Sequence, residues 1–212
     1  MKSTAQEFLK IIIFPVMFPL SWFIFRHIIG IYGLPTGFLL SYMAYWAIIL
    51  FISFYFLAYT GVNELFRFHW SGKLFWGVAA LIPAFAVFFV FFLPVFIKIR
   101  FPLLLMAIIA GIINSYCEEL FWRGLTMKTT VKYKKAVIIS SVIGFGLWHV
   151  TLATISGLKL PGGVYLFCVG LFLLGILWQF IAYKMNNLIF VTLAHVLVSI
   201  TVYTTLIYQN WQ

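Results

Sequence analysis

Long apolar runs constrain this sequence more than any other feature. A helix that crosses a bilayer needs about 20 mainly apolar residues, and seven runs of this kind occur between polar or Gly and Pro breaks. They cover residues 8–25, 36–60, 74–97, 101–122, 136–156, 163–183 and 187–208. Backbone groups inside a bilayer must be satisfied within the protein, so we predict an all-α, polytopic transmembrane helical bundle of about seven spans. Six or eight spans are alternatives, because the first run is short and the break from Lys98 to Pro102 is tight.

Composition and organisation point to one membrane domain. Only 8% of the 212 residues are charged, against about 25% in an ordinary soluble domain. No internal repeat, low-complexity tract or long linker separates a second unit. We therefore expect residues 1–212 to form a single integral membrane domain. The motifs described below fall in a core of about residues 101–208.

Basic residues predict the orientation of the chain. The formal net charge of +10 could indicate a nucleic-acid partner, but the basic residues cluster in short loops, as expected beside anionic lipid headgroups, so we predict no nucleic-acid binding. The N-terminus and loops 61–73, 123–135 and 184–186 hold Lys2, Lys10, Arg67, Lys73, Arg123, Lys128, Lys132, Lys134, Lys135 and Lys184. The other side holds Arg26, Lys98, Arg100 and Lys159. Ten against four predicts a multi-pass protein of the cytoplasmic membrane with its N-terminus in the cytoplasm. We interpret His27 and His69, which lie beside Arg26 and Arg67, as interfacial.

The carboxylates are few and concentrated. The chain has no aspartate and four glutamates, of which Glu118 and Glu119 are adjacent near the end of the fourth run. A charge at the bilayer centre costs about 2.5–3.5 kcal/mol, so this pair should have a partner or a function. Arg123, four residues after Glu119, is the expected partner. Glu118 should point about 100° away, into the bundle. Alternatively, both glutamates lie at the interface and neutralise the basic loop that follows.

Two histidines lie in other apolar runs. His149 follows Phe145 by one helical turn, and His195 precedes Ser199 by one turn. A lone membrane histidine is usually a hydrogen-bonded packing residue, but two histidines and a carboxylate pair on three helices favour a shared site. At about 1.5 Å per residue Glu119 and His195 have similar depths. His149 agrees only if its helix begins near Ser140 or extends into the cytoplasm.

Taken in order, three motifs resemble the CPBP (Abi, CAAX-processing) family of intramembrane proteases, of glutamic type. They are Glu-Glu-x-x-x-Arg from Glu118 to Arg123, Phe-x-x-x-His from Phe145 to His149, and His-x-x-x-Ser from His195 to Ser199. The family pattern has Asn or a similar polar residue where this chain has Ser199. Serine can still donate one hydrogen bond.

The resemblance implies a hydrolytic mechanism. Glu118 would be the general base and would work with His149 on a water that attacks the scissile carbonyl, while His195 and Ser199 would stabilise the oxyanion. Glu119, Arg123 and Phe145 would support the site. No cofactor is expected. Zinc, held by Glu118, His149 and His195, is less favoured because the His-Glu-x-x-His spacing is missing.

The resemblance also implies a substrate class, a membrane-anchored, lipidated or hydrophobic peptide that enters laterally between helices and is cut near the cytoplasmic face. Maturation, sorting-signal processing and bacteriocin immunity are the expected roles, and the oligomeric state stays open.

Two other classes of function remain. One is a proton-coupled transporter that uses the same glutamates and histidines as a relay, although repeated halves are missing. The other is a non-catalytic immunity or scaffold protein.

Overall fold

The regular structure is entirely helical. The computed structural model describes residues 4–57, 62–66 and 74–211, and within these residues every element is a helix. Seven helices are long and apolar enough to cross a membrane. They run Thr4–Tyr32, Thr36–Leu57, Leu74–Phe96, Phe101–Met127, Val131–Ala153, Gly163–Met185 and Ile189–Trp211. The predicted all-α bundle of seven spans is confirmed.

Five of these spans are single α-helices and two contain a π-helical turn. The single ones are α1 (Thr4–Tyr32), α2 (Thr36–Leu57), α8 (Val131–Ala153), α9 (Gly163–Met185) and α10 (Ile189–Trp211). The third span joins α4 (Leu74–Val87), the π-turn η1 (Phe88–Phe92) and α5 (Leu93–Phe96). The fourth joins α6 (Phe101–Glu118), the π-turn η2 (Glu119–Gly124) and α7 (Leu125–Met127). A one-turn helix, α3 (Val62–Leu65), lies between the second and third spans.

Two spans begin earlier than the apolar runs do. The first helix is longer than the short apolar run that predicted it, because α1 has 29 residues. Helix α8 begins at Val131 rather than at 136, so the later start near Ser140 is wrong and the helix extends past its apolar part instead. Apolar runs mark only the segment in contact with lipid, whereas lysine is a good helix former and lets the helix continue through a polar segment. Because α8 begins at Val131, His149 lies further from the start of its helix than the apolar run suggested.

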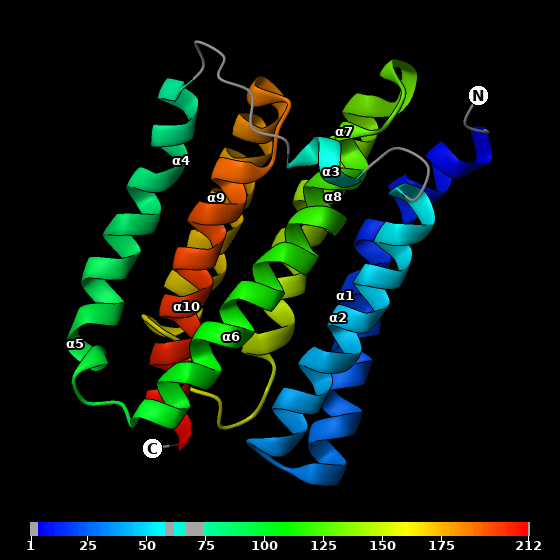
Figure 1. Ribbon diagram of the computed structural model, residues 1–212. Helices are drawn as coiled ribbons and strands as arrows, with labels where there is room; N and C mark the ends of the chain where they lie inside the picture. The colour runs from blue at the N-terminus through cyan, green and yellow to red at the C-terminus, as the bar shows by residue number, and fades with distance from the viewer. Residues whose placement is uncertain (1–3, 58–61, 67–73, 212) are drawn as a thin grey trace.

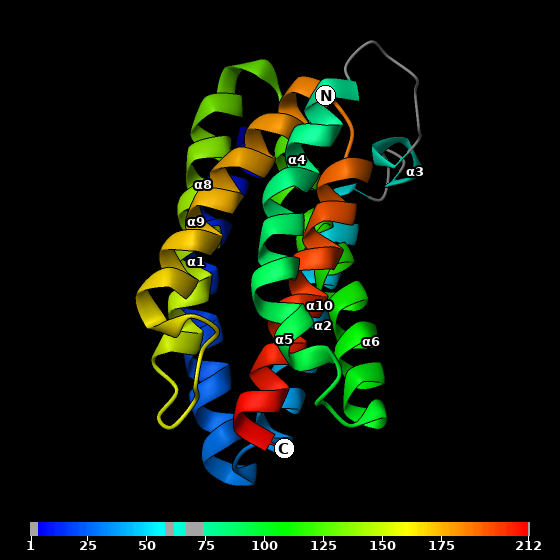
Figure 2. The same cartoon turned by 90° about the vertical axis from the view of Figure 1, so that its left-hand side faces the viewer.

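The helices form a bundle in which α10 is central. Helix α10 packs against α6 and α4, and α8 packs against α1 and α9. Figure 1 shows α1 and α2 at one side of the bundle and α4 with α5 at the other, and the turned view in Figure 2 agrees. The N-terminal part of α1, α3 and α7 lie at one end, and the end of α10 lies at the opposite end. The loops predicted to share one membrane face therefore lie together, as far as the structure describes them.

The charge count behind the predicted orientation changes in the structure. Lys10 and Arg123 are buried, at 0% and 1% exposure, and do not belong to the exposed loop charges. Lys2, Arg67 and Lys73, together with His69, lie outside the described residues. The chain is a multi-pass membrane protein, and the placement of its N-terminus in the cytoplasm stays a prediction.

A glycine allows α6 and α10 to approach closely. A Cβ atom on Gly111 would lie 2.8 Å from the backbone nitrogen of Ile200, so a larger residue would push the helices apart. One turn further on, the Ser115 and Ser199 hydroxyl oxygens are 3.0 Å apart. The crossing at Gly111 thereby sets the distance between the helix of the carboxylates and the helix of His195.

Candidate active site

The fourth span changes its helical form at the carboxylates. Glu118 is the last residue of α6, and Glu119 begins the π-turn η2. Such turns are frequent at functional sites. The Arg123 Nη1 atom donates to Glu119 Oε1 at 2.8 Å, and both side chains are buried. The predicted pair is present, and the Arg123 guanidinium also lies over the Phe145 ring, 4.3 Å from its centroid.

His195 lies between the two carboxylates. Its Nδ1 atom is 2.7 Å from Glu119 Oε1, and its Nε2 atom is 3.4 Å from Glu118 Oε2. The first contact is a hydrogen bond, whereas the second is close enough for an ion pair but lacks hydrogen-bond geometry. The sequence predicted that the Glu118 and Glu119 side chains point in different directions. In the structure one imidazole ring connects them.

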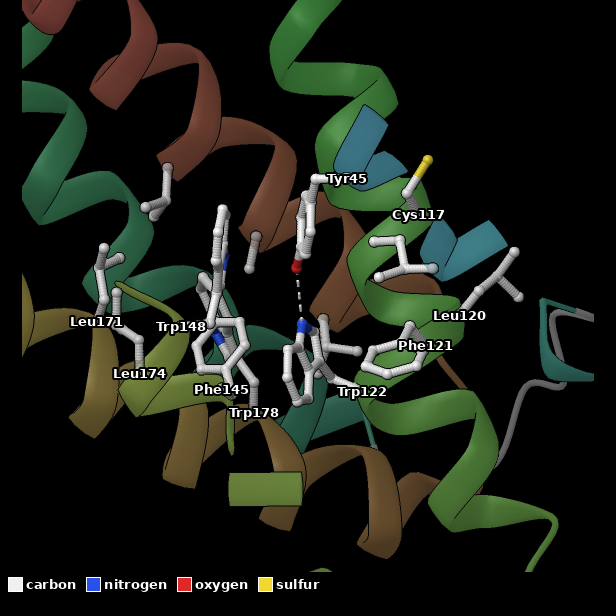
Figure 3. Close-up of a cluster of buried hydrophobic side chains, with 14 of the residues drawn as sticks. Tyr45, Cys117, Leu120, Phe121, Trp122, Phe145, Trp148, Leu171, Leu174 and Trp178 are labelled. Carbon is white, nitrogen blue, oxygen red and sulfur yellow. Dashed lines mark hydrogen bonds between the residues drawn. The ribbon is translucent and has the colours of Figure 1, made fainter. Parts of the chain in front are cut away.

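One oxygen of Glu118 is held by two aromatic side chains from other helices. Tyr45 on α2 donates its hydroxyl to Oε1 at 3.1 Å, and the Trp148 indole of α8 donates to the same atom at 2.9 Å. The two rings stack with centroids 4.0 Å apart. Trp122 in turn donates to the Tyr45 hydroxyl at 3.3 Å, as the dashed line in Figure 3 shows. Glu118 is thus fixed in place, with Oε2 left toward His195.

His149 has a defined tautomer. Its Nδ1 atom is 2.8 Å from the Phe145 carbonyl oxygen, one turn back on α8. A carbonyl oxygen can only accept, so Nδ1 carries the proton in this bond. In the neutral ring Nε2 then has a free lone pair and can accept a proton or a hydrogen bond. The Phe145 and His149 rings pack together with their centroids 4.6 Å apart, and this contact holds the imidazole in place.

A small cavity brings the predicted residues together. Its volume is about 30 Å³, which is enough for a water molecule. Glu118, His149, His195 and Ser199 all line it. The remaining lining residues are Tyr42, Asn114, Trp148, Leu152, Phe167, Leu171, Val198, Val202 and Tyr203. The four candidate catalytic residues, from three helices, therefore share one buried polar site within an apolar bundle.

Three contributors to this site were not predicted from the sequence. Tyr45 and Trp148 carry no signal, because 21% of the chain is aromatic. Asn114 lies four residues before Glu118 and so on the same helical face. A search for polar residues on that face of the fourth run would have found it.

The arrangement does not resemble a zinc site. Across residues 4–57, 62–66 and 74–211, no group of three His, Cys, Asp or Glu side chains could hold a metal ion. His195 directs Nδ1 to Glu119, and Glu118 Oε1 is occupied by Tyr45 and Trp148. Glu118, His149 and His195 thus line one cavity without converging on a common point as ligands.

Comparison with known proteins identifies the family of the core. Residues 99–201 match the family described as type II CAAX prenyl endopeptidase Rce1-like. The matched segment runs from two residues before α6 begins to the middle of α10 and includes all three motifs. Comparisons with curated proteins and with solved structures gave no match. Residues 99–201 therefore belong to the Rce1-like CAAX prenyl endopeptidase family, a family of peptide hydrolases.

Proposed function

We propose that this Rce1-like protein is an intramembrane endopeptidase in which Glu118 and His149 activate water. One observation carries the proposal: Glu118 and the His149 imidazole line the same small cavity, which has room for a water molecule. Both groups are held by neighbours, so they do not need to reorganise when a substrate arrives. The buried ion pair of Glu119 with Arg123 lies beside them and supports the same reading.

The reaction requires Glu118 to take up one proton and later to release it. Glu118 takes a proton from the water, the water oxygen bonds to the scissile carbonyl carbon, and His149 Nε2 accepts a hydrogen bond from the remaining O–H. The carbonyl oxygen becomes negative in the tetrahedral intermediate, and His195 stabilises it. Glu118 then returns its proton to the amide nitrogen as the C–N bond breaks. Water is consumed, and the products are a carboxylic acid and an amine, which ionise to a carboxylate and an ammonium group.

The substrate is a peptide in the bilayer, as the family implies. We propose a membrane-anchored, lipidated or hydrophobic peptide that enters laterally. An apolar groove of about 100 Å³ supports such a path, because Phe167, Leu171, Val198 and Val202 line both the groove and the cavity. Protein maturation, sorting-signal processing and bacteriocin immunity are the roles that fit this substrate class.

The test compares the membrane peptides of cells that make the wild type or Glu118→Gln at equal abundance. Glutamine keeps the shape of the side chain but cannot act as a base, so we expect wild-type-specific fragments to fall about 10²–10⁴-fold. His149→Ala should give a similar loss, and Ser199→Ala a smaller one because it loses the contact with Ser115 across α6 and α10. Glu64→Gln is the matched control, because Glu64 is an exposed carboxylate paired with Lys128.

The outcomes separate the classes of function. Cleavage at the wild-type level in both Glu118→Gln and His149→Ala would refute the proposed mechanism. If the peptide pattern did not change but proton-coupled flux fell in Glu118→Gln, the protein would be a transporter. A scaffold protein would lose neither activity.

A further inference from the structure

Asn114 is a polar side chain that no motif assigns. It lies on α6 one turn before Glu118, about 6 Å from it along the helix axis. The side chain is buried, at 6% exposure, and lines the same cavity as Glu118 and His195. It is therefore placed to contact any group that occupies the site.

Trp46 determines which end of the Asn114 amide faces the cavity. The Trp46 indole nitrogen is 2.8 Å from Asn114 Oδ1. An indole N–H can only donate, so its partner must be the amide oxygen and the NH₂ group lies on the other side of the planar amide. In the described part of the chain this NH₂ group donates no hydrogen bond. Asn114 thus has a donor group that is oriented and uncommitted.

Ser199 is in the opposite situation. The Ser115 hydroxyl lies 2.8 Å from the Gly111 carbonyl oxygen and 3.0 Å from the Ser199 hydroxyl. For both contacts to be hydrogen bonds, the single Ser115 proton must go to the Gly111 carbonyl, which can only accept, and the Ser199 hydroxyl must donate to Ser115. Ser199 then presents lone pairs, rather than a proton, to the cavity. Lone pairs repel an oxyanion.

We propose that Asn114, through its NH₂ group, is the catalytic residue that binds the oxyanion together with His195, the role that the family resemblance gives to position 199. Trp46 is the positioning residue that orients it. This inference rests on the proposed endopeptidase function and makes it specific. A donor held at the developing charge stabilises the transition state more than the substrate, so it acts on kcat.

The experiment uses purified full-length protein and the peptide that the comparison with Glu118→Gln identifies. Asn114→Ala should lower kcat about 10²–10³-fold, as loss of an oxyanion donor does. The KM should change little, because the substrate carbonyl interacts weakly with this donor. Asn210→Ala is the matched control, since Asn210 is also a hydrogen-bonded asparagine, with backbone partners, but lies at the end of α10, outside the cavity. Its kcat should equal that of the wild type.

Two further variants distinguish catalysis from packing. Trp46→Phe keeps a ring but loses the N–H group, so it should lower kcat in the wild type and have no further effect in Asn114→Ala. Adding Ser199→Asn to Asn114→Ala moves the amide to the facing helix and should restore part of kcat. A general loss of packing would show neither pattern, and melting temperatures report it separately.

The results decide between the two proposals. If Glu118→Gln is inactive but Asn114→Ala keeps the wild-type kcat, the Asn114 assignment is wrong and the endopeptidase proposal stands. If Glu118→Gln cleaves normally, the endopeptidase proposal fails first. Should Asn114→Ala fail to fold, Trp46→Phe carries the test, and an unchanged kcat in that variant overturns the assignment.

Discussion

At the residue scale, the two oxygens of Glu118 have different surroundings. Oε1 accepts hydrogen bonds from Tyr45 and Trp148, whereas Oε2 faces the His195 ring. When hydrogen bonds hold one oxygen of a carboxylate, the other oxygen can still accept a proton. This division explains how a buried glutamate can be both fixed and reactive in the proposed mechanism.

The Tyr45 hydroxyl offers a test of that division. Tyr45→Phe removes one of the two donors to Oε1 but keeps the ring that stacks on Trp148. A hydrogen bond to a charged group contributes about 1.5–3 kcal/mol, so kcat/KM should fall roughly tenfold or more while Trp148 still holds the carboxylate. Tyr55→Phe, at an exposed position, is the control. Equal activity of both variants would show that Trp148 alone positions Glu118.

The sequence predicted the motif residues of the site but not those that hold them. Glu118, Glu119, His149 and His195 stand out because ionisable groups are rare in an apolar chain. Tyr45, Trp46 and Trp148 do not stand out, because aromatic residues are common along the whole sequence. Their role depends on which helices pack together, and that is a property of the fold.

At the element scale, the π-turn η2 altered the expected geometry most. A regular α-helix predicts that Glu118 and Glu119 point about 100° apart. The structure instead lets both reach the imidazole of His195. Apolar runs locate spans well, since all seven are present, but they do not reveal a change of helical form within a span.

The crossing of α6 and α10 provides a prediction at this scale. In Gly111→Ala the new methyl group would meet the Ile200 backbone, which cannot rotate away as a side chain can. We expect a loss of about 1–3 kcal/mol of stability and a lower kcat, since Ser115 and Asn114 would move away from α10. Thermal melting in detergent and the peptide assay measure the two effects.

A glycine with free space is the control for this crossing. A Cβ atom on Gly30 in α1 would meet nothing within 4 Å, so Gly30→Ala should keep full activity. If Gly111→Ala were as stable and active as Gly30→Ala, close approach of the two helices would not matter for the site.

At the scale of the whole molecule, the site extends beyond the segment that matches the family. The match covers residues 99–201, yet Tyr45 and Trp46 of α2 contact Glu118 and Asn114. We propose on this ground that residues 1–212 form one domain. The early helices carry no motif, but they complete the core of about residues 101–208.

The orientation in the membrane is a further prediction. In a chain whose native cysteines are replaced, Ser156→Cys should react with a membrane-impermeant maleimide added outside intact cells. Lys132→Cys should react only after the membrane is opened, because we predict that the basic end of the bundle faces the cytoplasm. Both positions lie outside the hydrophobic core of the bundle. The reverse pattern of labelling would invert the proposed topology.

The position of His195 on α10 bears on how the protein is made. The ribosome completes α6 and η2 well before it reaches α10, so Glu118 and Glu119 enter the membrane without the histidine that later lies between them. During this interval Glu119 already has its partner Arg123 on the same span. Arrival of α10 supplies the missing imidazole and the remaining residues that line the cavity. A chain still in the insertion machinery therefore lacks the assembled site that we propose to be proteolytic.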